Sequence, residues 1–367
     1  MHRRADLRIL VDIGHPALVH VFRNAMRIWL AKGHQVTIAA RDKDIATELL
    51  DLYGFSYCTI SKARRGTLGL AIELIERNWQ LLKLARQCES EVLLGTSVSI
   101  SHVARLMGTQ ALVFNDDDAD AVRAFALLAY PLAHAIITPS CLDEDYGQRH
   151  VQFDGYKELA YLHPNVYTPD PGILSKLGVH PGEPHYVVRF VAFQASHDRS
   201  ASGLSLAMRR KLVQELSRRG RLFISSERPL LGEFEPYGFR ISPKDMHDAL
   251  AFATMLITDG QTMTAEAAVL GVPAIRCNTF VGRISYLEEL EHKYGLTYGF
   301  LPQEEGQMFN KVVQLLDQGN LRVKWQTKRE KMLADKIDLT PWLVDFVERY
   351  PQSFRDYQQQ AASGGAR

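Results

Sequence analysis

The sequence predicts two α/β domains, each a doubly wound, mostly parallel sheet covered by helices on both faces. Short apolar runs alternate with helical patterns, first between Leu7 and Thr138 and again between His185 and Lys293. Alternation of this length requires a parallel sheet with both faces buried. The chain has 367 residues, more than the ~250–300 residues at which a single core usually stops growing. We therefore expect two cores.

The first half is expected to contain six strands and five helices. Its first helix has Val19, Phe22 and Met26 on one side and Gly33 just past its end, as expected of an amphipathic helix with a glycine stop. The predicted strands are Arg8–Ile13, Gln35–Ala40, Phe55–Ile60, Glu91–Leu94, Ala111–Asn115 and Ala135–Thr138, and the predicted helices are Leu18–Ala31, Asp44–Tyr53, Leu68–Cys88, Val98–Met107 and Ala119–Ala129.

A break between the halves follows Tyr161. Five prolines and three glycines occur between Tyr161 and Pro184 without a sustained hydrophobic period, which is typical of a linker. We place an N-terminal domain at 1–165, the linker at 166–184 and a C-terminal domain at 185–340. Residues 341–367 are expected to form a helix that returns to the first domain and a disordered tail.

The second half resumes the alternation and ends in helices. Its predicted strands are His185–Val191, Leu222–Ser225, Met255–Thr258 and Ala274–Cys277, and its predicted helices are Leu204–Arg219, Lys244–Phe252, Thr262–Gly271, Ile284–Lys293, Glu304–Asp317, Leu321–Ala334 and Pro341–Arg355. The segment Gln358–Arg367 is predicted to be disordered.

Composition excludes several classes of partner. Lys and Arg number 43 against 42 Asp and Glu, a net charge of +1, so no bulk charge attracts nucleic acid. The four cysteines form no C-x-x-C pair, which argues against a zinc site and indicates a reduced, cytoplasmic protein. The most apolar segment, Ala124–Thr138, is too short for a membrane span. We expect no metal, no cofactor and no transmembrane segment.

The stretch T-D-G-Q-T-M-T-A-E-A-A-V-L-G-V-P, Thr258–Pro273, reads as a strand end, a tight turn and a helix. Backbone N–H groups of Gly260, Gln261 and Thr262 would stand at the positive end of the helix dipole, where phosphate binds readily. Glu266 follows Thr262 by one turn and could accept hydrogen bonds from a ribose diol. The alternative is a plain Thr262 cap with Glu266 as a first-turn acid, which the dipole favours without any ligand.

Two loops of the first domain carry groups suited to acid–base chemistry. His15 and His20 flank the start of the first helix, and imidazole is a plausible general base at neutral pH, although a single histidine is more often structural. Asp118 ends the run Asn115-Asp116-Asp117-Asp118. Such carboxylates either cap the following helix or bind a cation or substrate hydroxyls; we assign no metal.

Two loops of the second domain could complete a site for a diphosphate. Arg189 precedes a long polar loop containing Ser196 and His197, and an arginine there could pair with a diphosphate. The loop lacks G-x-G-x-x-G, so it is not a dinucleotide fingerprint; it could also be a solvated loop. Met246, near the start of a predicted helix, could lie under a planar base, although a core contact is the commoner role.

Together these motifs resemble a known family. D-M-H-D-A-L-A-F-A (Asp245–Ala253), paired with the stretch Thr258–Pro273, resembles the donor half of GT-B-fold glycosyltransferases. With I-L-V-D-I-G-H-P-A-L-V-H-V-F at Ile9–Phe22, the chain looks like an uncharacterised GT-B family of bacteria and archaea, related to UDP-N-acetylglucosamine 2-epimerases and to the peptidoglycan N-acetylglucosaminyltransferase. The resemblance implies two Rossmann-like domains facing across a cleft.

The resemblance also implies a function. Glu266 would hold the ribose of a nucleotide diphosphate sugar, with a UDP-sugar favoured, and Met246 would adjoin the base. The tripeptide His20-Val21-Phe22 matches the transferase, which implies His20 as a base toward an unknown sugar or lipid-linked acceptor in polysaccharide biosynthesis. The preceding G-G-x-G-G of the transferase and the Ser-Gly-Gly of the epimerases are absent. Transfer is favoured over epimerisation; a non-catalytic nucleotide-sugar-binding protein and an enzyme acting on another phosphate compound are the other candidates.

Overall fold

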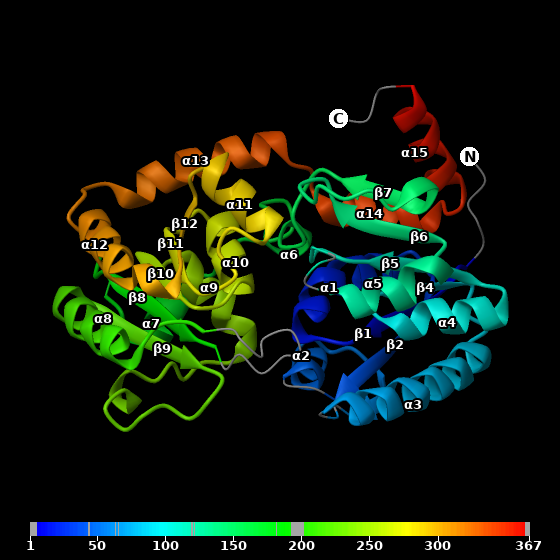
Figure 1. Ribbon diagram of the computed structural model, residues 1–367, viewed down its shortest axis with the longest axis horizontal. Coiled ribbons are helices and arrows are strands. Elements are labelled where there is room, and N and C mark those ends of the chain that lie inside the picture. The colour runs from blue at the N-terminus through cyan, green and yellow to red at the C-terminus, as the bar shows by residue number, and fades with distance from the viewer. Residues whose placement is uncertain are drawn as a thin grey trace. The chain divides into compact units, whose positions relative to one another are not determined.

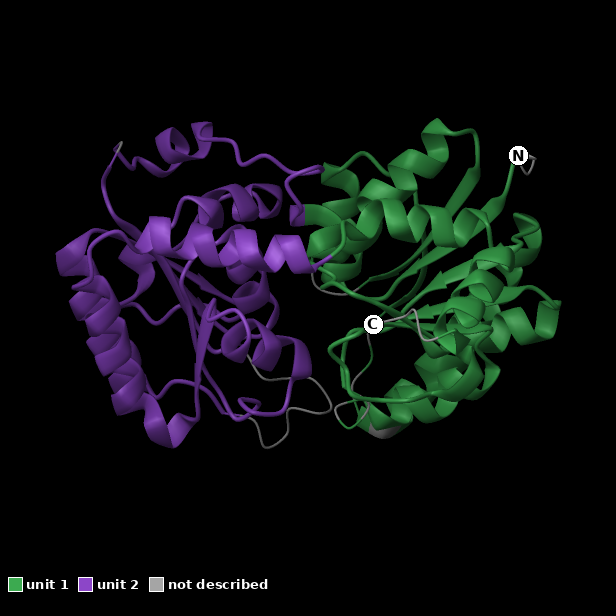
Figure 2. Cartoon of the chain, turned by 90° about the horizontal axis from the view of Figure 1, so that it is seen from above, with its two compact units in different colours: residues 1–161, 337–367 green, residues 162–336 purple. Residues whose placement is uncertain are grey.

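The chain folds into two compact units. The computed structural model describes residues 6–42, 45–62, 64, 66–118, 120, 122–180, 182–191 and 202–363. Unit 1 comprises residues 1–161 and 337–367, and unit 2 comprises residues 162–336 (Figure 2). The C-terminal segment therefore belongs to the same compact unit as the N-terminal one.

Unit 1 is built on a parallel sheet of seven strands in the order β3-β2-β1-β4-β5-β6-β7 (Figure 1). The strands are β1 (Arg8–Ile13), β2 (Gln35–Asp42), β3 (Cys58–Lys62), β4 (Val92–Gly95), β5 (Gln110–Phe114), β6 (Ala135–Pro139) and β7 (His150–Phe153). The order reverses between β1 and β4, and open parallel sheets bind ligands beyond the carboxyl ends of the strands at such a switch point.

Helices cover both faces of this sheet. Those in unit 1 are α1 (Pro16–Ala31), α2 (Ala46–Leu52), α3 (Gly66–Gln87), α4 (Val98–Met107), α5 (Arg123–Ala129), α14 (Leu339–Glu348) and α15 (Gln352–Ala362); α6 (Leu159–Leu162) spans the junction of the units. Side chains of α3, α4 and α5 share one buried core with β1 and β4. Helix α1 begins at Pro16, where a missing N–H costs nothing, and buries Val19, Phe22 and Met26 as its sequence period predicts.

Unit 2 is built on a parallel sheet of five strands in the order β12-β11-β10-β8-β9. Its strands are β8 (His185–Phe190), β9 (Arg221–Ser226), β10 (Met255–Thr258), β11 (Ala274–Cys277) and β12 (Thr297–Phe300), and its helices are α7 (Gly172–Leu177), α8 (Leu206–Arg219), α9 (Met246–Ala251), α10 (Thr262–Leu270), α11 (Ser285–His292), α12 (Glu305–Leu316) and α13 (Leu321–Asp335). Here the switch point lies between β8 and β10.

Helix α10 is buried along most of its length. Every residue from Thr264 to Leu270 is buried, and the helix stops at Gly271 with φ of 72°, a left-handed conformation that glycine adopts without strain. The last carbonyls accept hydrogen bonds from α13: Arg329 Nε donates to Val269 O at 2.7 Å and Gln326 Nε2 to Leu270 O at 3.1 Å. Side chains thus satisfy a helix end that water does not reach.

Several expectations from the sequence need correction. Strands β7 and β12 are not among the predicted ones, because polar residues in His-Val-Gln-Phe of β7 and a glycine in Thr-Tyr-Gly-Phe of β12 interrupt the apolar run. The expected helix Pro341–Arg355 is two helices that part at Pro351, whose ring removes a backbone donor. The expectation of disorder from Gln358 onward is wrong as far as Ala362, because α15 docks on unit 1 through Gln358 Nε2 and Gln148 O, 2.8 Å apart.

No helix in the described part of the chain is long and apolar enough to cross a membrane.

Candidate functional site

The switch point of unit 2 is where β8 and β10 end side by side. Val191, just after β8, donates its backbone N–H to Oδ1 of Asp259, just after β10, at 2.6 Å. Asn278 Nδ2, after β11, donates to Asp259 O at 3.0 Å. Asp259 is fully buried, so three strand ends are tied together through one residue. This fixes the backbone from which the next turn departs.

Gly260 allows the turn to pass close to β8. A Cβ atom at this position would lie 2.8 Å from Val191 Cγ2 and 3.4 Å from Thr258 Oγ1. Contacts under about 3 Å between such carbon atoms are repulsive, so any larger side chain must push the turn or Val191 aside. The glycine that the sequence pattern singled out is therefore required by close packing at the carboxyl edge of the sheet.

Replacing Gly260 by alanine is expected to displace this turn. The new methyl group meets Val191, which follows the neighbouring strand, and overpacking of this kind costs ~1–3 kcal/mol. Differential scanning calorimetry should show a lower melting temperature for Gly260→Ala. Gly306→Ala is the matched control, because no atom lies within 4 Å of a Cβ there and alanine is favoured over glycine in a helix. Equal melting temperatures for the two variants would contradict the account.

The N-terminus of α10 presents backbone donors without a side-chain cap. Gln261 is the N-cap residue and its side chain makes no capping hydrogen bond, and no acidic residue stands in the first turn. Thr258 Oγ1 accepts the N–H of Gly260 at 2.9 Å, and Thr264 Oγ1 donates to Gly260 O at 2.8 Å. Gln261 and Thr262 are partly exposed. The plain Thr262 cap considered from the sequence is not formed, since Thr262 is itself the first helical residue.

Glu266 lies one turn further along α10 and is held by a histidine. Its Oε1 is 3.0 Å from Nε2 of His247 on α9, and Glu266 is only 5% and His247 only 3% exposed. The ring of Tyr167 packs edge-on against His247 at 6.5 Å between centroids. The carboxylate is thereby fixed in a buried place beside the helix start.

His247 was not among the residues singled out from the sequence. The sequence did draw attention to its helix, because His247 directly follows Met246. Spacing within α9 could not reveal its partner, because Glu266 belongs to another helix and only the packing of α9 on α10 brings them together.

The other candidate residues of the second domain have less direct relations to the start of α10. Arg189, on β8, donates from Nη1 to Ser225 Oγ at 2.6 Å and from Nη2 to Glu227 Oε1 at 2.9 Å. It lies at the carboxyl end of its strand and is already bonded to β9. Met246 begins α9 and is partly exposed. Ser196 and His197 lie outside the described residues.

Asp259 is a titratable residue that directly precedes the turn leading into the N-terminus of α10. Burial raises the pKa of its carboxyl to about 6, against the opposing effects of the Val191 amide and the Arg209 guanidinium. Arg209 Nη2 lies 3.1 Å from Oδ2. An anion bound at α10 would therefore face a carboxyl whose charge is either compensated by Arg209 or removed by protonation.

This pKa predicts a pH-dependent stability with a definite sign. The carboxyl titrates near 4 in the unfolded chain and at about 6 in the folded protein, so between these values only the folded protein holds the proton. The free energy of unfolding should therefore fall as pH rises through this window, by on the order of 2–3 kcal/mol. Urea unfolding of Asp259→Asn should show a flatter pH profile than the wild type; parallel profiles would rule out this role.

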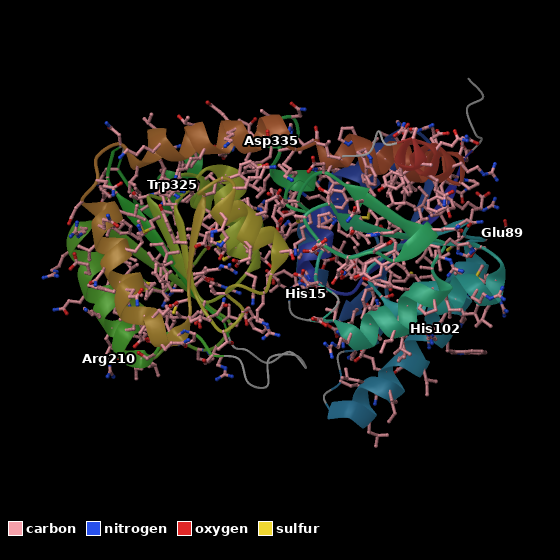
Figure 3. All side chains as sticks on the ribbon, turned by 45° about the horizontal axis from the view of Figure 1, so that its top comes forward. His15, Glu89, His102, Arg210, Trp325 and Asp335 are labelled. Atoms are coloured by element: carbon pink, nitrogen blue, oxygen red, sulfur yellow. The ribbon has the colours of Figure 1, made fainter. Side chains whose placement is uncertain are left out.

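In unit 1, His15 and His20 occupy different environments. His15 is the exposed N-cap of α1, labelled in Figure 3, and its Nδ1 accepts the N–H of Ala17 at 3.3 Å. His20 is 8% exposed, and its Nδ1 lies 3.3 Å from both Arg23 Nη1 and Tyr53 Oη. Arginine has no acceptor, so Nδ1 of His20 is the accepting nitrogen. Its lone pair faces Arg23.

The negative charge of Asp116, in the acidic loop after β5, is compensated within unit 1. Asp116 forms an ion pair with Lys157, which follows β7, and both are buried. Asn115 Nδ2 donates to Asp117 O at 2.6 Å. Asp118 is partly exposed. The loop is thus a structured turn in which Asp116 is neutralised, rather than three equivalent carboxylates. The described residues contain no group of three His, Cys, Asp or Glu arranged to hold a metal ion.

A buried ionic cluster at the unit 1 switch point was missed from the sequence. Asp12, at the end of β1, is fully buried and forms an ion pair with Arg77 of α3, and it accepts a hydrogen bond from Ser97 Oγ at the start of α4. Arg77 Nη1 also donates to Ser61 Oγ at 2.9 Å. Gly95 permits this packing, since a Cβ there would lie 2.6 Å from Asp12 O. The cluster fixes the strand end that leads to His15.

Comparison with known proteins places the chain in a family. Residues 7–287 match the model of the family described as "Protein of unknown function (DUF354)", and the chain belongs to that family. It is similar to the uncharacterized protein MJ0665 of Methanocaldococcus jannaschii, with 26% identity over 284 residues, which cover 74% of this chain and 82% of that protein. The family resemblance expected from the sequence is confirmed.

Solved structures identify the fold as GT-B. The spinosyn forosaminyltransferase SpnP matches with a TM-score of 0.63 and 16% identity, covering 96% of this chain and 100% of that chain. The S. aureus MnaA–UDP co-structure matches with a TM-score of 0.67 and 12% identity over 95% and 97% of the chains. A UDP-N-acetylglucosamine 2-epimerase matches with a TM-score of 0.62 and 12% identity over 95% and 98%. The predicted fold class is confirmed.

Proposed function

We propose that this member of the family is a glycosyltransferase that transfers a sugar from a nucleotide diphosphate sugar, with a UDP-sugar favoured, to an acceptor hydroxyl. The observation that carries the proposal is the start of α10. Its N-cap side chain forms no cap, it follows a glycine required by close packing, and a buried carboxylate lies one turn inside. This combination offers amides to a diphosphate and an acceptor to a sugar hydroxyl.

Each donor-side residue then has a distinct role. The backbone N–H groups of Gln261 and Thr262 bind the diphosphate and stabilise the negative charge that develops on it as the sugar leaves. The N–H of Gly260 joins them after exchanging its bond to Thr258 Oγ1. Arg189 adds positive charge from the neighbouring strand after exchanging its bond to Glu227. Glu266, held by His247, accepts the ribose hydroxyls. Met246 adjoins the base, and the loop containing Ser196 and His197 contributes further donors to the phosphates.

Unit 1 supplies the base that removes the proton of the acceptor. His15 and Asp118 are the more accessible candidates, since both are at least partly exposed. His20 qualifies only if its Nδ1 lone pair turns from Arg23, or if it acts by orienting the loop that carries His15. Because a general base contributes ~10²–10⁴-fold to the rate, His15→Gln, His20→Gln and Asp118→Asn should separate the base from residues that only support it.

A nucleotide-sugar epimerase is the second candidate. It is favoured by the similarity to a solved UDP-N-acetylglucosamine 2-epimerase at a TM-score of 0.62. Epimerisation requires a group that removes a proton from the sugar ring itself, whereas transfer requires one that acts on a separate acceptor. The two candidates share the donor site and differ in product.

One assay separates these candidates. The protein is incubated with UDP-, GDP-, CDP- and dTDP-sugars, with and without sugar or lipid-linked acceptors, and products are resolved by chromatography. A transferase releases nucleoside diphosphate in an acceptor-dependent manner, and an epimerase yields a new nucleotide sugar without release. A protein that binds the nucleotide sugar yet forms neither product would be a sensor or an assembly subunit, and the proposal would fail.

A further inference from the structure

The outward face of α3 in unit 1 carries large apolar side chains in solvent. These side chains, which we call the α3 stripe, are Leu68 (74% exposed), Ile72 (44%), Ile75 (71%) and Trp79 (66%). Their spacing of four, three and four residues places them on one side of a helix. Lys83 and Arg86 continue the same row, and at 3.6 residues per turn all six lie within an arc of about 80°.

The α3 stripe is separate from the face that α3 gives to the protein core. Leu81 and Ala85 are fully buried in the core that α3 shares with α4 and the sheet. Outward apolar side chains continue on the neighbouring helices, with Leu106 of α4 68% exposed and Leu127 of α5 75% exposed. Figure 3 shows side chains of α3 projecting away from the sheet. Apolar surface gathered on one face, unlike scattered single residues, marks an interaction site.

On this face the exposed basic side chains outnumber the exposed acidic ones. Within the ranges of α3, α4 and α5 the acidic residues are Glu73 and Glu76. Glu73 is buried and bonded to Arg41 at 2.5 and 2.7 Å, and Glu76 forms an ion pair with Arg64 at 3.0 Å. Lys83, Arg86 and Arg105 are exposed on these same three helices. The partner that fits is therefore apolar in part and negatively charged.

We propose that the α3 stripe, with Lys83, Arg86 and Arg105, docks unit 1 on the surface of an anionic membrane. An interfacial helix of this kind buries its apolar face at the boundary of headgroups and acyl chains while basic residues meet anionic lipid. Tryptophan is enriched at that boundary. A second copy of the chain fits less well, because its matching face would carry the same excess of positive charge.

This docking goes beyond the donor chemistry and does not use the donor site. Its residues all belong to α3, α4 and α5, and none is among those assigned to the nucleotide sugar. Taken together with the proposed function, it selects the lipid-linked alternative for the acceptor, which would be reached at the membrane surface. Membrane docking can fail while glycosyl transfer stands, and the reverse also holds.

The test is flotation of the full chain with vesicles of phosphatidylcholine alone or mixed with phosphatidylglycerol. We expect the wild type to float with the mixed vesicles at low salt and to be released at about 1 M salt, where screening reduces the Debye length to ~3 Å. The double variants Ile75→Ser/Trp79→Ser and Lys83→Glu/Arg86→Glu should each lower the bound fraction at least about tenfold. Both change exposed side chains, so the fold, checked by circular dichroism, should persist.

Val323→Ser is the matched control, because Val323 is exposed to 67% and lies on α13 of unit 2; it should float like the wild type. Equal flotation of the wild type and both double variants, binding that is indifferent to phosphatidylglycerol, or absence of binding would each overturn the proposal. So would a wild-type dimer in sedimentation velocity that Ile75→Ser/Trp79→Ser converts to monomer, since the stripe would then be an interface between copies.

Discussion

Glu266→Gln is expected to weaken binding of the donor nucleotide sugar by about 10- to 100-fold, the loss of a charged hydrogen bond. The carboxylate that accepts from the ribose becomes an amide with one acceptor, and that oxygen is already engaged by His247. Glutamine has nearly the same shape, so the packing of α9 on α10 should persist. Isothermal titration calorimetry with the nucleotide sugar selected by the product assay measures the change.

The control for this variant is Glu291→Gln. Glu291 is also a largely buried acid of unit 2, and burial raises the pKa of its carboxyl, but it lies on α11 and faces Arg276. Its replacement should leave donor affinity within a factor of about two, since it contacts no assigned donor group. If Glu266→Gln bound the donor as tightly as Glu291→Gln does, the ribose role of Glu266 would be wrong.

Arg77→Ala is expected to lower the free energy of unfolding by ~3–5 kcal/mol, because it leaves the Asp12 carboxylate buried without its countercharge. Arg77 is 6% exposed and Asp12 is fully buried, so water cannot replace the guanidinium at low cost. Urea denaturation at neutral pH measures the loss. The double variant Asp12→Leu/Arg77→Met should recover much of it, since it removes both charges from the core.

An exposed ion pair between Glu76 of the same helix and Arg64, which precedes it, provides the comparison. Arg64 and Glu76 are 3.0 Å apart with side chains 47% and 42% exposed, and solvent-exposed pairs contribute only ~0–1 kcal/mol. Arg64→Ala should therefore have little effect on the urea midpoint. A loss for Arg77→Ala no larger than that for Arg64→Ala would show that the buried cluster does not stabilise unit 1.

Much of the fold could be predicted because its information is local. The period of α1, the glycine that ends α10 and the alternation of strands with helices all lie within short windows of sequence. Strands β7 and β12 were not predicted because polar residues or a glycine interrupt their apolar residues. The part of α15 beyond Arg355 was not predicted, because it makes contacts with residues near Gln148, about two hundred positions away.

In the candidate site, too, local motifs could be predicted from the sequence and contacts between distant residues could not. Gly260 and the start of α10 were recognised from a contiguous motif, and the structure adds the reason for the glycine in its approach to Val191. The Glu266–His247 and Asp12–Arg77 pairs join residues on separate elements. Which acid faces which base is decided by helix packing, and neither spacing nor composition contains that information.

Hydrogen–deuterium exchange with saturating UDP-sugar, or with the donor that the product assay selects, tests the central claim most directly. Binding at the helix start should slow exchange of the amides of Gln261 and Thr262, which would then donate to the diphosphate, and of Gly260, which would exchange its bond to Thr258 for one to the diphosphate. Amides of α9 beside Glu266 should be protected as well. A nucleotide sugar that binds and turns over while protecting only other segments, and leaving these three amides unchanged, would contradict the assignment of the donor site.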